Sequence, residues 1–253
     1  MADLDLLPVQ TPLLKFYLSS MKERLSEANY ESLLKHLKKV SDDYRKELET
    51  VSPGQERARV VHLLMEAELK NAAHIPHNCS KGCGACCHLE VEISKDEGEL
   101  LAQLVLDGHP IDHARLRKQA ARERKDAAWT ERVVTDNRCV FLDASDSCSV
   151  YENRPAVCRK VLVTTPASYC SDADQAPVPI TIPLAELIIS TALSQPQNPF
   201  ASISKSVARG LDRFAELKAI SQELPAVPTA AELAELLLPE TGQPGETSLD
   251  PLS

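Results

Sequence analysis

Eight cysteines are the residues of this chain best suited to chemistry, because all of them lie within one stretch of 92 of its 253 residues. An early group has the spacing Cys-x3-Cys-x2-Cys-Cys and a later group is more widely spaced; together they comprise Cys79, Cys83, Cys86, Cys87, Cys139, Cys148, Cys158 and Cys170. Clustered cysteines form disulfides, bind metal or act as a redox-active pair.

The first residues of the chain argue against disulfides between the cysteines. Met1-Ala2-Asp3-Leu4-Asp5 carries acids where a secretory signal has a basic residue and then a long apolar run. We therefore expect a cytoplasmic protein, in which reducing conditions disfavour a disulfide framework. A thiol–disulfide switch has less support, since the sequence does not supply a Cys-x-x-Cys pair before a helix with its partner sheet.

The early cysteine group has features of a metal-binding loop. A tetrahedral metal such as zinc needs thiolates converging at about 2.3 Å, which cysteines two or three residues apart on a tight loop can achieve. Gly82 and Gly84 flank Cys83 and let the backbone wrap closely round an ion. Lys81 adds a positive charge that favours the ligating thiolate form. This group predicts a metal site.

Two questions about the early group stay open. Cys86 and Cys87 are adjacent, and adjacent side chains of an extended strand point in opposite directions. They serve one site only if the backbone kinks between them; otherwise they face two sites. His74, His77 and His88 flank the loop and could ligate, although eight thiolates already suffice for one or two sites of four ligands.

The later group supplies partners for the early one. Residues 140–142 read as a short apolar strand and residues 143–147 as a turn. We expect the two groups to meet in space across the 51 residues that separate Cys87 from Cys139.

These motifs carry a resemblance to a known family. The early spacing, then Cys139-Val140-Phe141-Leu142, then Cys148-Ser149-Val150-Tyr151-Glu152-Asn153-Arg154-Pro155-Ala156-Val157-Cys158-Arg159, resembles the YkgJ-type cysteine-cluster family. That family is described as a zinc- or iron-chelating domain with eight recurring cysteines, and the resemblance covers about residues 79–170. It implies that all eight cysteines are metal ligands.

The ligand types limit the metal. Thiolates without carboxylates exclude calcium and magnesium, and leave zinc, copper(I) or iron–sulfur. Three cysteines from one loop and a distant fourth near a proline are typical of iron–sulfur ligation, and Cys158 follows Pro155 by three residues. We therefore favour a [4Fe–4S] cluster over zinc.

Three other residues of the motif have two readings each. Arg154 and Arg159 could offset thiolate charge or form surface ion pairs, and Tyr151 could pack on the site.

Helices are predicted on both sides of the cysteine region. Apolar residues recur at helical spacing over about 12–25, 29–51, 55–73, 94–107, 183–193 and 202–217. A capping box at Ser94 and a cap at Asp112 start two of the inner helices, the second running to about Trp129, and Pro155 starts a helical turn. His36 and His62 read as ordinary helix residues.

The expected fold is mainly α: a helical scaffold around an irregular cysteine-rich metal-binding core with at most short strands. The expected parts are N-terminal helices over 1–73, a cysteine-cluster metal-binding domain over 74–172 and C-terminal helices over 173–222. Residues 223–253 are expected to form a short helix near 229–238 and a disordered tail.

Composition and motifs limit the classes of partner and function that fit this protein. A net charge of −9 argues against nucleic acid as a partner, and no apolar run is long enough to span a membrane. The expected function is a cytosolic protein that holds an iron–sulfur cluster or zinc, with the flanking helices as a possible surface for a protein partner.

An enzyme is less expected. The radical S-adenosylmethionine spacing Cys-x3-Cys-x2-Cys is present, but the alternating strands and helices of its barrel are not. The alternative is an iron–sulfur-dependent methyltransferase similar to flagellin lysine N-methylase, an analogy only.

Overall fold

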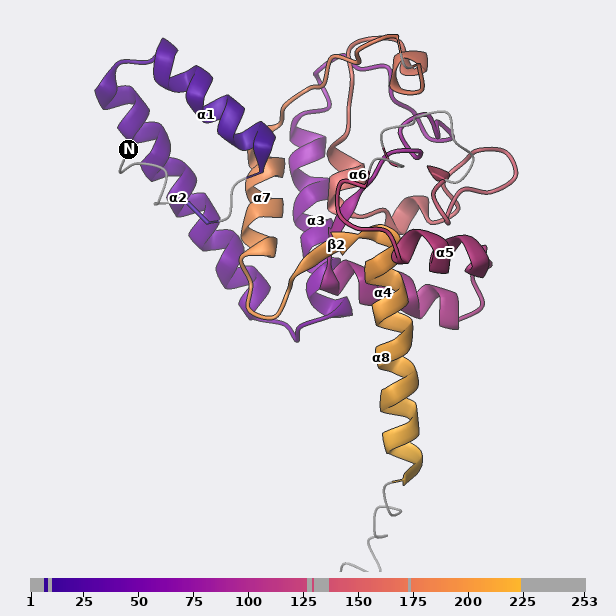
Figure 1. Ribbon diagram of the computed structural model, residues 1–253. Helices are drawn as coiled ribbons and strands as arrows, with labels where there is room; N and C mark the ends of the chain where they lie inside the picture. The colour runs from indigo at the N-terminus through magenta and orange to yellow at the C-terminus, as the bar shows by residue number, and fades with distance from the viewer. Residues whose placement is uncertain (1–6, 9–10, 127–128, 130–136, 173, 224–253) are drawn as a thin grey trace, which may run out of the picture. The chain divides into compact units, whose positions relative to one another are not determined.

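The computed structural model describes residues 7–8, 11–126, 129, 137–172 and 174–223 (Figure 1). The chain divides into two compact units, 1–214 and 215–253, and residues 215–223 of the second are helical. The elements in chain order are α1 (Pro12–Arg24), α2 (Glu27–Glu49), α3 (Gln55–Asn71), β1 (Glu92–Ser94), α4 (Lys95–Leu106), α5 (His113–Ala120), η4 (Tyr151–Asn153), α6 (Ala156–Lys160), η5 (Ala167–Cys170), α7 (Pro183–Leu193), β2 (Phe200–Ser202) and α8 (Ile203–Glu223). The fold of the described residues is mainly α with one two-stranded sheet, as the sequence predicts.

The three leading helices and α7 share one apolar core. Thr11 caps α1 by accepting a hydrogen bond from the Leu14 amide at 3.3 Å, and Ser26 caps α2 in the same way. Leu18 of α1, Leu34 of α2 and Leu187 of α7 are almost completely buried in this core. Helix α7 lies against α2 and α3, although more than a hundred residues separate them in the sequence (Figure 1).

A second apolar core lies beside the cysteine loops. It joins Ile93 of β1, Leu101 of α4 and Val207 of α8 to Phe141 from the later cysteine group, and Cys139 and Cys148 pack against it. Strands β1 and β2 pair antiparallel, with Ile93 opposite Ala201. Helices α4 and α8 approach closely at Gly210, where an added Cβ would lie 2.7 Å from the Cβ of Ala102.

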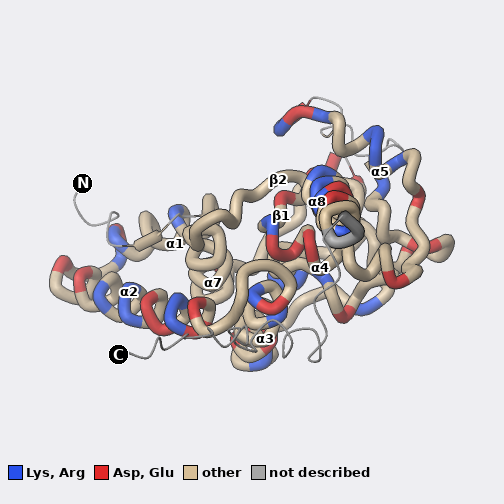
Figure 2. The backbone as a smooth tube through the Cα atoms, turned by 90° about the horizontal axis from the view of Figure 1, so that it is seen from below, with Lys and Arg blue, Asp and Glu red and all other residues tan. Residues whose placement is uncertain are grey.

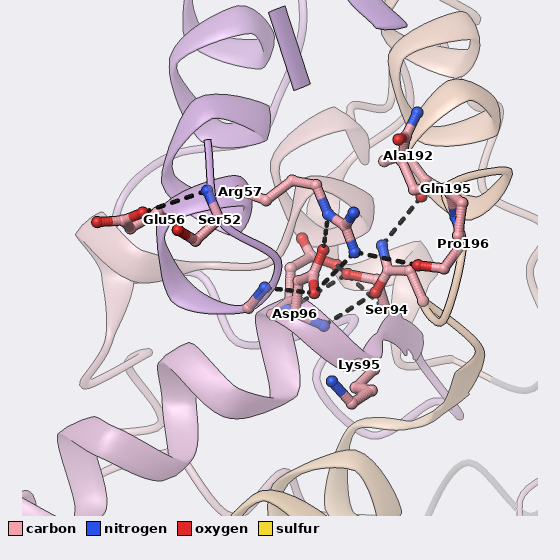
Figure 3. Close-up of polar contacts among 12 residues, drawn as sticks. Ser52, Glu56, Arg57, Ser94, Lys95, Asp96, Ala192, Gln195 and Pro196 are labelled. Atoms are coloured by element: carbon pink, nitrogen blue, oxygen red, sulfur yellow. Dashed lines mark hydrogen bonds and ion pairs between the residues drawn. The ribbon is translucent and has the colours of Figure 1, made fainter. Parts of the chain in front are cut away.

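A buried ion pair connects the two cores (Figure 3). Arg57 of α3 donates from Nε to Oδ2 of Asp96 on α4 at 2.5 Å, and both side chains are nearly completely buried. The Gly54 amide donates to Oδ1 of Asp96 at 2.8 Å, and Gly54, with a φ of 103°, is the residue just before α3. This ion pair fixes α4, and with it β1, against α3.

Charge on the outer helices is mixed. Lys or Arg and Asp or Glu alternate along α2 (Figure 2), where Lys38, Arg45 and Lys46 pair with Asp42 or Asp43. This pattern makes the exposed side of α2 a solvated face. Within the described residues, no helix has the length and apolar character needed to cross a membrane.

Most predicted elements are confirmed. Helices α1, α2, α3, α7 and α8 lie where helical periodicity places them, and the capping box at Ser94 is present. Pro155 is the N-cap of α6, and Asp112 caps α5. The short helix predicted near 229–238 and the tail lie outside the described residues.

Two local predictions are wrong. Helix α5 ends at Ala120, nine residues before Trp129; Lys125 has a φ of 59°, which a right-handed helix does not allow. Residues 140–142 do not form a strand, because Val140 and Phe141 lie in a turn and only Leu142 makes a bridge, to Cys148. Their apolar side chains serve the second core from a turn instead.

Candidate metal centre

The early cysteine loop is a series of tight turns. The Cys83 amide donates to the Ser80 carbonyl at 3.2 Å, and the Cys87 amide donates to the Gly84 carbonyl at 2.9 Å. The second of these turns kinks the backbone between Cys86 and Cys87. Both cysteines consequently line the same cavity.

Glycines let the two cysteine groups meet. The Cys139 amide donates to the Cys87 carbonyl at 2.9 Å, and the Ser147 hydroxyl donates to the Gly82 carbonyl at 3.4 Å. At Gly84 an added Cβ would lie 2.2 Å from the carbonyl oxygen of Asp146, so only glycine allows this approach. The predicted meeting of the two groups is confirmed.

The turn over residues 143–147 shapes the later loop. The carboxylate of Asp143 accepts hydrogen bonds from the amides of Ser145 and Ser147 at 2.8 and 3.0 Å. Hydrogen bonds from the Ser145 hydroxyl and these amides lower the pKa of Asp143. The turn returns the chain so that Cys148 bridges to Leu142.

Glu97 positions the helix that carries Cys158. Its Oε1 accepts a hydrogen bond from the Ala156 amide at 2.7 Å, at the start of α6, and its Oε2 accepts one from the Ser94 hydroxyl at 2.9 Å. His62 Nε2 lies 3.4 Å from the same Oε1 and is also buried. His62 is therefore more than the ordinary helix residue expected from the sequence. Although burial raises the pKa of Glu97, the hydrogen bonds and charge from His62, Ala156 and Ser94 outweigh burial and lower it.

Four cysteines from three segments line one cavity of about 190 Å³. Two come from the early loop, one from the later loop and one from α6: Cys86, Cys87, Cys139 and Cys158. The other walls are mostly apolar and include Leu89, Val91, Val157, Val161 and Ile203. Four thiols facing one apolar cavity form a donor set that fits a soft metal or cluster.

The thiols are not at coordination distances from one common point. Among the described residues, no three His, Cys, Asp or Glu side chains form a group that could hold a metal ion. The fit to a metal therefore rests on the chemistry of the four half-buried thiols around the cavity.

The four thiols around the cavity differ in pKa. The Cys87 thiol donates a hydrogen bond to Cys86 and lowers its pKa to about 7, while the same bond and burial raise the pKa of Cys87. Burial raises the pKa of Cys139 to about 11 and that of Cys158 well above its usual value, with neighbouring thiols adding to both shifts. Metal binding must therefore release protons from these buried thiols.

The other four cysteines do not line the cavity. Cys79 accepts a hydrogen bond from the backbone of Val163, and burial raises its pKa. Cys79 and Cys83 interact electrostatically with each other, and Cys148 interacts with Cys86. Cys170 is buried in η5, with 8% of its surface exposed.

The flanking histidines do not line the cysteine cavity of the described chain. His74 is exposed and its Nδ1 lies 3.0 Å from the Asn71 carbonyl oxygen, as expected for a loop histidine. His77 is exposed as well. His88 is half-buried, and burial lowers its pKa.

The two motif arginines have different roles. The Arg154 guanidinium lies 3.7 Å from the centre of the Tyr151 ring, and Lys81 lies 5.0 Å from the same ring. Arg159 donates to the carbonyls of Arg154 and Glu152, so it braces the backbone of this loop. Arg154 is the arginine whose charge reaches the thiols: it helps to lower the pKa of Cys86.

Comparison with known proteins bears on the same segment. Residues 78–175 match the model of the CxxCxxCC family, described as "Putative zinc- or iron-chelating domain". The matched family is the YkgJ-type cysteine-cluster family, and the match covers less than half of the chain. The resemblance seen in the sequence is thereby confirmed, and the description of the family supports metal binding by this segment. No curated protein and no solved structure matches the chain.

Sequence reasoning missed the residues that support the centre. The Ser94-x-x-Glu97 pattern reveals the local cap, but not the contacts of Glu97 with His62 and Ala156, which lie 35 and 59 residues away in the chain. Trp129 lines the cysteine cavity, and nothing in its sequence surroundings marks it for that position.

Proposed function

We propose that this protein holds a [4Fe–4S] cluster in the cysteine cavity, with Cys86, Cys87, Cys139 and Cys158 as ligands. The observation that carries the proposal is the convergence of these four thiols on one cavity from three separate segments. When bound, such a cluster supplies one-electron transfer.

The size of the cavity favours a cluster over zinc. Four sulfurs at about 2.3 Å from one zinc ion contact one another and leave no space among them. A cavity of about 190 Å³ between the thiols and the apolar wall is much larger than a single ion. The eight inorganic atoms of a [4Fe–4S] cluster need such a space.

The proposal extends to the remaining cysteines. Cys79, Cys83, Cys148 and Cys170 belong to the same eight-cysteine pattern, and we assign them as metal ligands of the same domain. Charge interactions of Cys79 and Cys148 with Cys86 support this assignment. We place the protein in the cytoplasm, because a reducing compartment keeps cysteine ligands available for metal.

Anaerobic reconstitution tests the ligand assignment. The wild-type protein is treated with ferrous iron and sulfide, and bound iron, sulfide and visible absorption are measured. Cys86→Ser and Cys158→Ser should lose the cluster, while Ser80→Ala, in the same loop but without a thiol, should retain it. Full cluster content in both cysteine variants would refute the assignment of these ligands.

A further inference from the structure

Buried polar atoms without a partner are few in the described residues. The side-chain atoms concerned are His62 Nε2, Glu99 Oε1, Trp129 Nε1 and Arg154 Nε. Two of them have charged neighbours that account for their burial. His62 faces Glu97 at 3.4 Å, and Glu99 Oε1 lies 2.8 Å from Lys95 Nζ and 3.0 Å from an Arg213 nitrogen. The other two are N–H donors, and both border the cysteines.

Trp129 is a wall of the cysteine cavity. Its side chain is 6% exposed and lines the cavity together with the four thiols. The Arg122 guanidinium lies 4.5 Å from the ring centre, so one face of the indole is covered. A buried indole N–H usually has an acceptor, but Trp129 Nε1 has none within the described parts of the chain.

Arg154 lies beside other thiols of the same cluster. Its guanidinium stacks on Tyr151, and its Nε is buried without an acceptor among the described residues. Its charge acts on Cys79, Cys86 and Cys148, which come from both cysteine groups. A buried N–H donor without an acceptor is costly, so Nε of this half-buried arginine needs an acceptor.

We propose that the Trp129 indole N–H and the Arg154 Nε–H donate hydrogen bonds to sulfur atoms of the metal centre, an inference that rests on the function proposed above. The acceptors are thiolate or sulfide sulfurs, which become available when the centre forms. Both are positioning residues: they hold the sulfurs and offset their negative charge. Hydrogen bonds to sulfur set the reduction potential of such clusters, and outer ligand partners raise metal affinity.

Substitution of each donor tests the proposal. Trp129→Phe keeps an aromatic ring without the N–H, and Arg154→Met keeps the apolar stem without the charge. Each should weaken metal binding about 10-fold or more, measured with zinc against a competing chelator, since loss of an outer-shell partner costs 10- to 100-fold. In the reconstituted protein, each should also make the reduction potential more negative. Arg154→Lys should fall between Arg154→Met and the wild type, because it restores the charge alone.

A matched control and the metal-free protein separate this role from a purely structural one. Arg124→Met removes an arginine that stacks on Phe200 and pairs with Glu92, and it should leave zinc affinity and potential unchanged. Arg154→Met should not lower the melting temperature of the metal-free protein, because it removes a buried Nε–H that lacks an acceptor there. A lowered melting temperature with unchanged zinc affinity would show a structural role and overturn the proposal for Arg154.

Tryptophan fluorescence gives an independent readout. Trp129 is the only tryptophan of the chain, so all indole emission reports on this position. Loading the cluster should quench that emission almost completely if Trp129 contacts the centre. Normal loading with undiminished emission, or with unchanged affinity and potential in both donor variants, would overturn this inference and leave the proposed function standing. Failure of the wild type to bind any metal would overturn both.

Discussion

At the scale of single residues, Glu97 links the helical scaffold to the metal site. One fully buried carboxylate accepts hydrogen bonds from the N-cap of α4 and from the first amide of α6, and it lies beside His62 of α3. Because α6 carries Cys158, the position of this proposed ligand depends on a residue that does not touch metal.

Glu97→Gln should destabilise the protein by about 3 kcal/mol, because its amide cannot accept all the hydrogen bonds that the carboxylate accepts and leaves a buried donor unpaired. Chemical denaturation of the metal-free protein measures this change. Glu66→Gln, at an exposed position paired with Lys70, should leave stability nearly unchanged and serves as the control. Equal stabilities for the two variants would contradict the role given to Glu97.

The lowered pKa of Glu97 predicts a pH dependence. A carboxyl group with a lowered folded-state pKa contributes stability above its usual value of 4.5, and that contribution is lost as the pH falls below it. The stability difference between wild type and Glu97→Gln should therefore shrink between about pH 5 and pH 3. Denaturation curves at several pH values check this, and a constant difference would contradict it.

At the scale of elements, the two cysteine loops are held together by close backbone packing. Gly84→Ala would place a methyl group against the Asp146 carbonyl oxygen, and such overpacking costs about 1–3 kcal/mol. We expect lower stability and reduced metal loading in this variant.

Gly108→Ala is the matched comparison for that prediction. Gly108 has open space around it but a φ of 100°, so the cost is conformational, about 1 kcal/mol, and an added methyl group would not clash with either loop. Gly108→Ala should lose stability while keeping full metal loading. Equal loading in the two glycine variants, measured by metal analysis, would show that the close approach at Gly84 does not organise the site.

Metal loss should loosen the cysteine region more than the leading helices. The first core consists almost entirely of residues from α1, α2, α3 and α7, none of which carries a cysteine. Binding to a folded metal site adds folding free energy, so Cys83→Ser should make residues 74–170 protease-sensitive while the leading helices persist. Peptide mapping of a limited digest, with Ser80→Ala as control, measures this; identical digests would argue against a structural metal centre.

The sequence predicts regular elements well and irregular ones less well. Helical periodicity and caps locate α1, α2, α3, α4 and α7, because these signals lie within each helix. The end of α5 and the turn at Val140 depend on backbone conformations and on packing against distant elements, which periodicity does not encode. The kink at Cys86 and Cys87 likewise comes from a turn hydrogen bond to Gly84.

At the scale of the whole molecule, a helical scaffold holds an irregular cysteine-rich segment from several sides. The Arg57–Asp96 ion pair joins the two cores, and Lys160 of α6 pairs with the buried Glu186 of α7. The sequence predicts that the two cysteine groups meet, and they do. It does not predict the supporting contacts, because partners such as Glu97 and Ala156 are far apart in the chain.

The central claim is that the cavity bounded by Cys86, Cys87, Cys139 and Cys158 holds a [4Fe–4S] cluster. Anaerobic purification of the full chain, followed by iron, sulfide and zinc analysis and a visible spectrum, tests it most directly. The account predicts a brown protein with four iron and four sulfide per cluster and broad visible absorption. A colourless anaerobic preparation with stoichiometric zinc would contradict it.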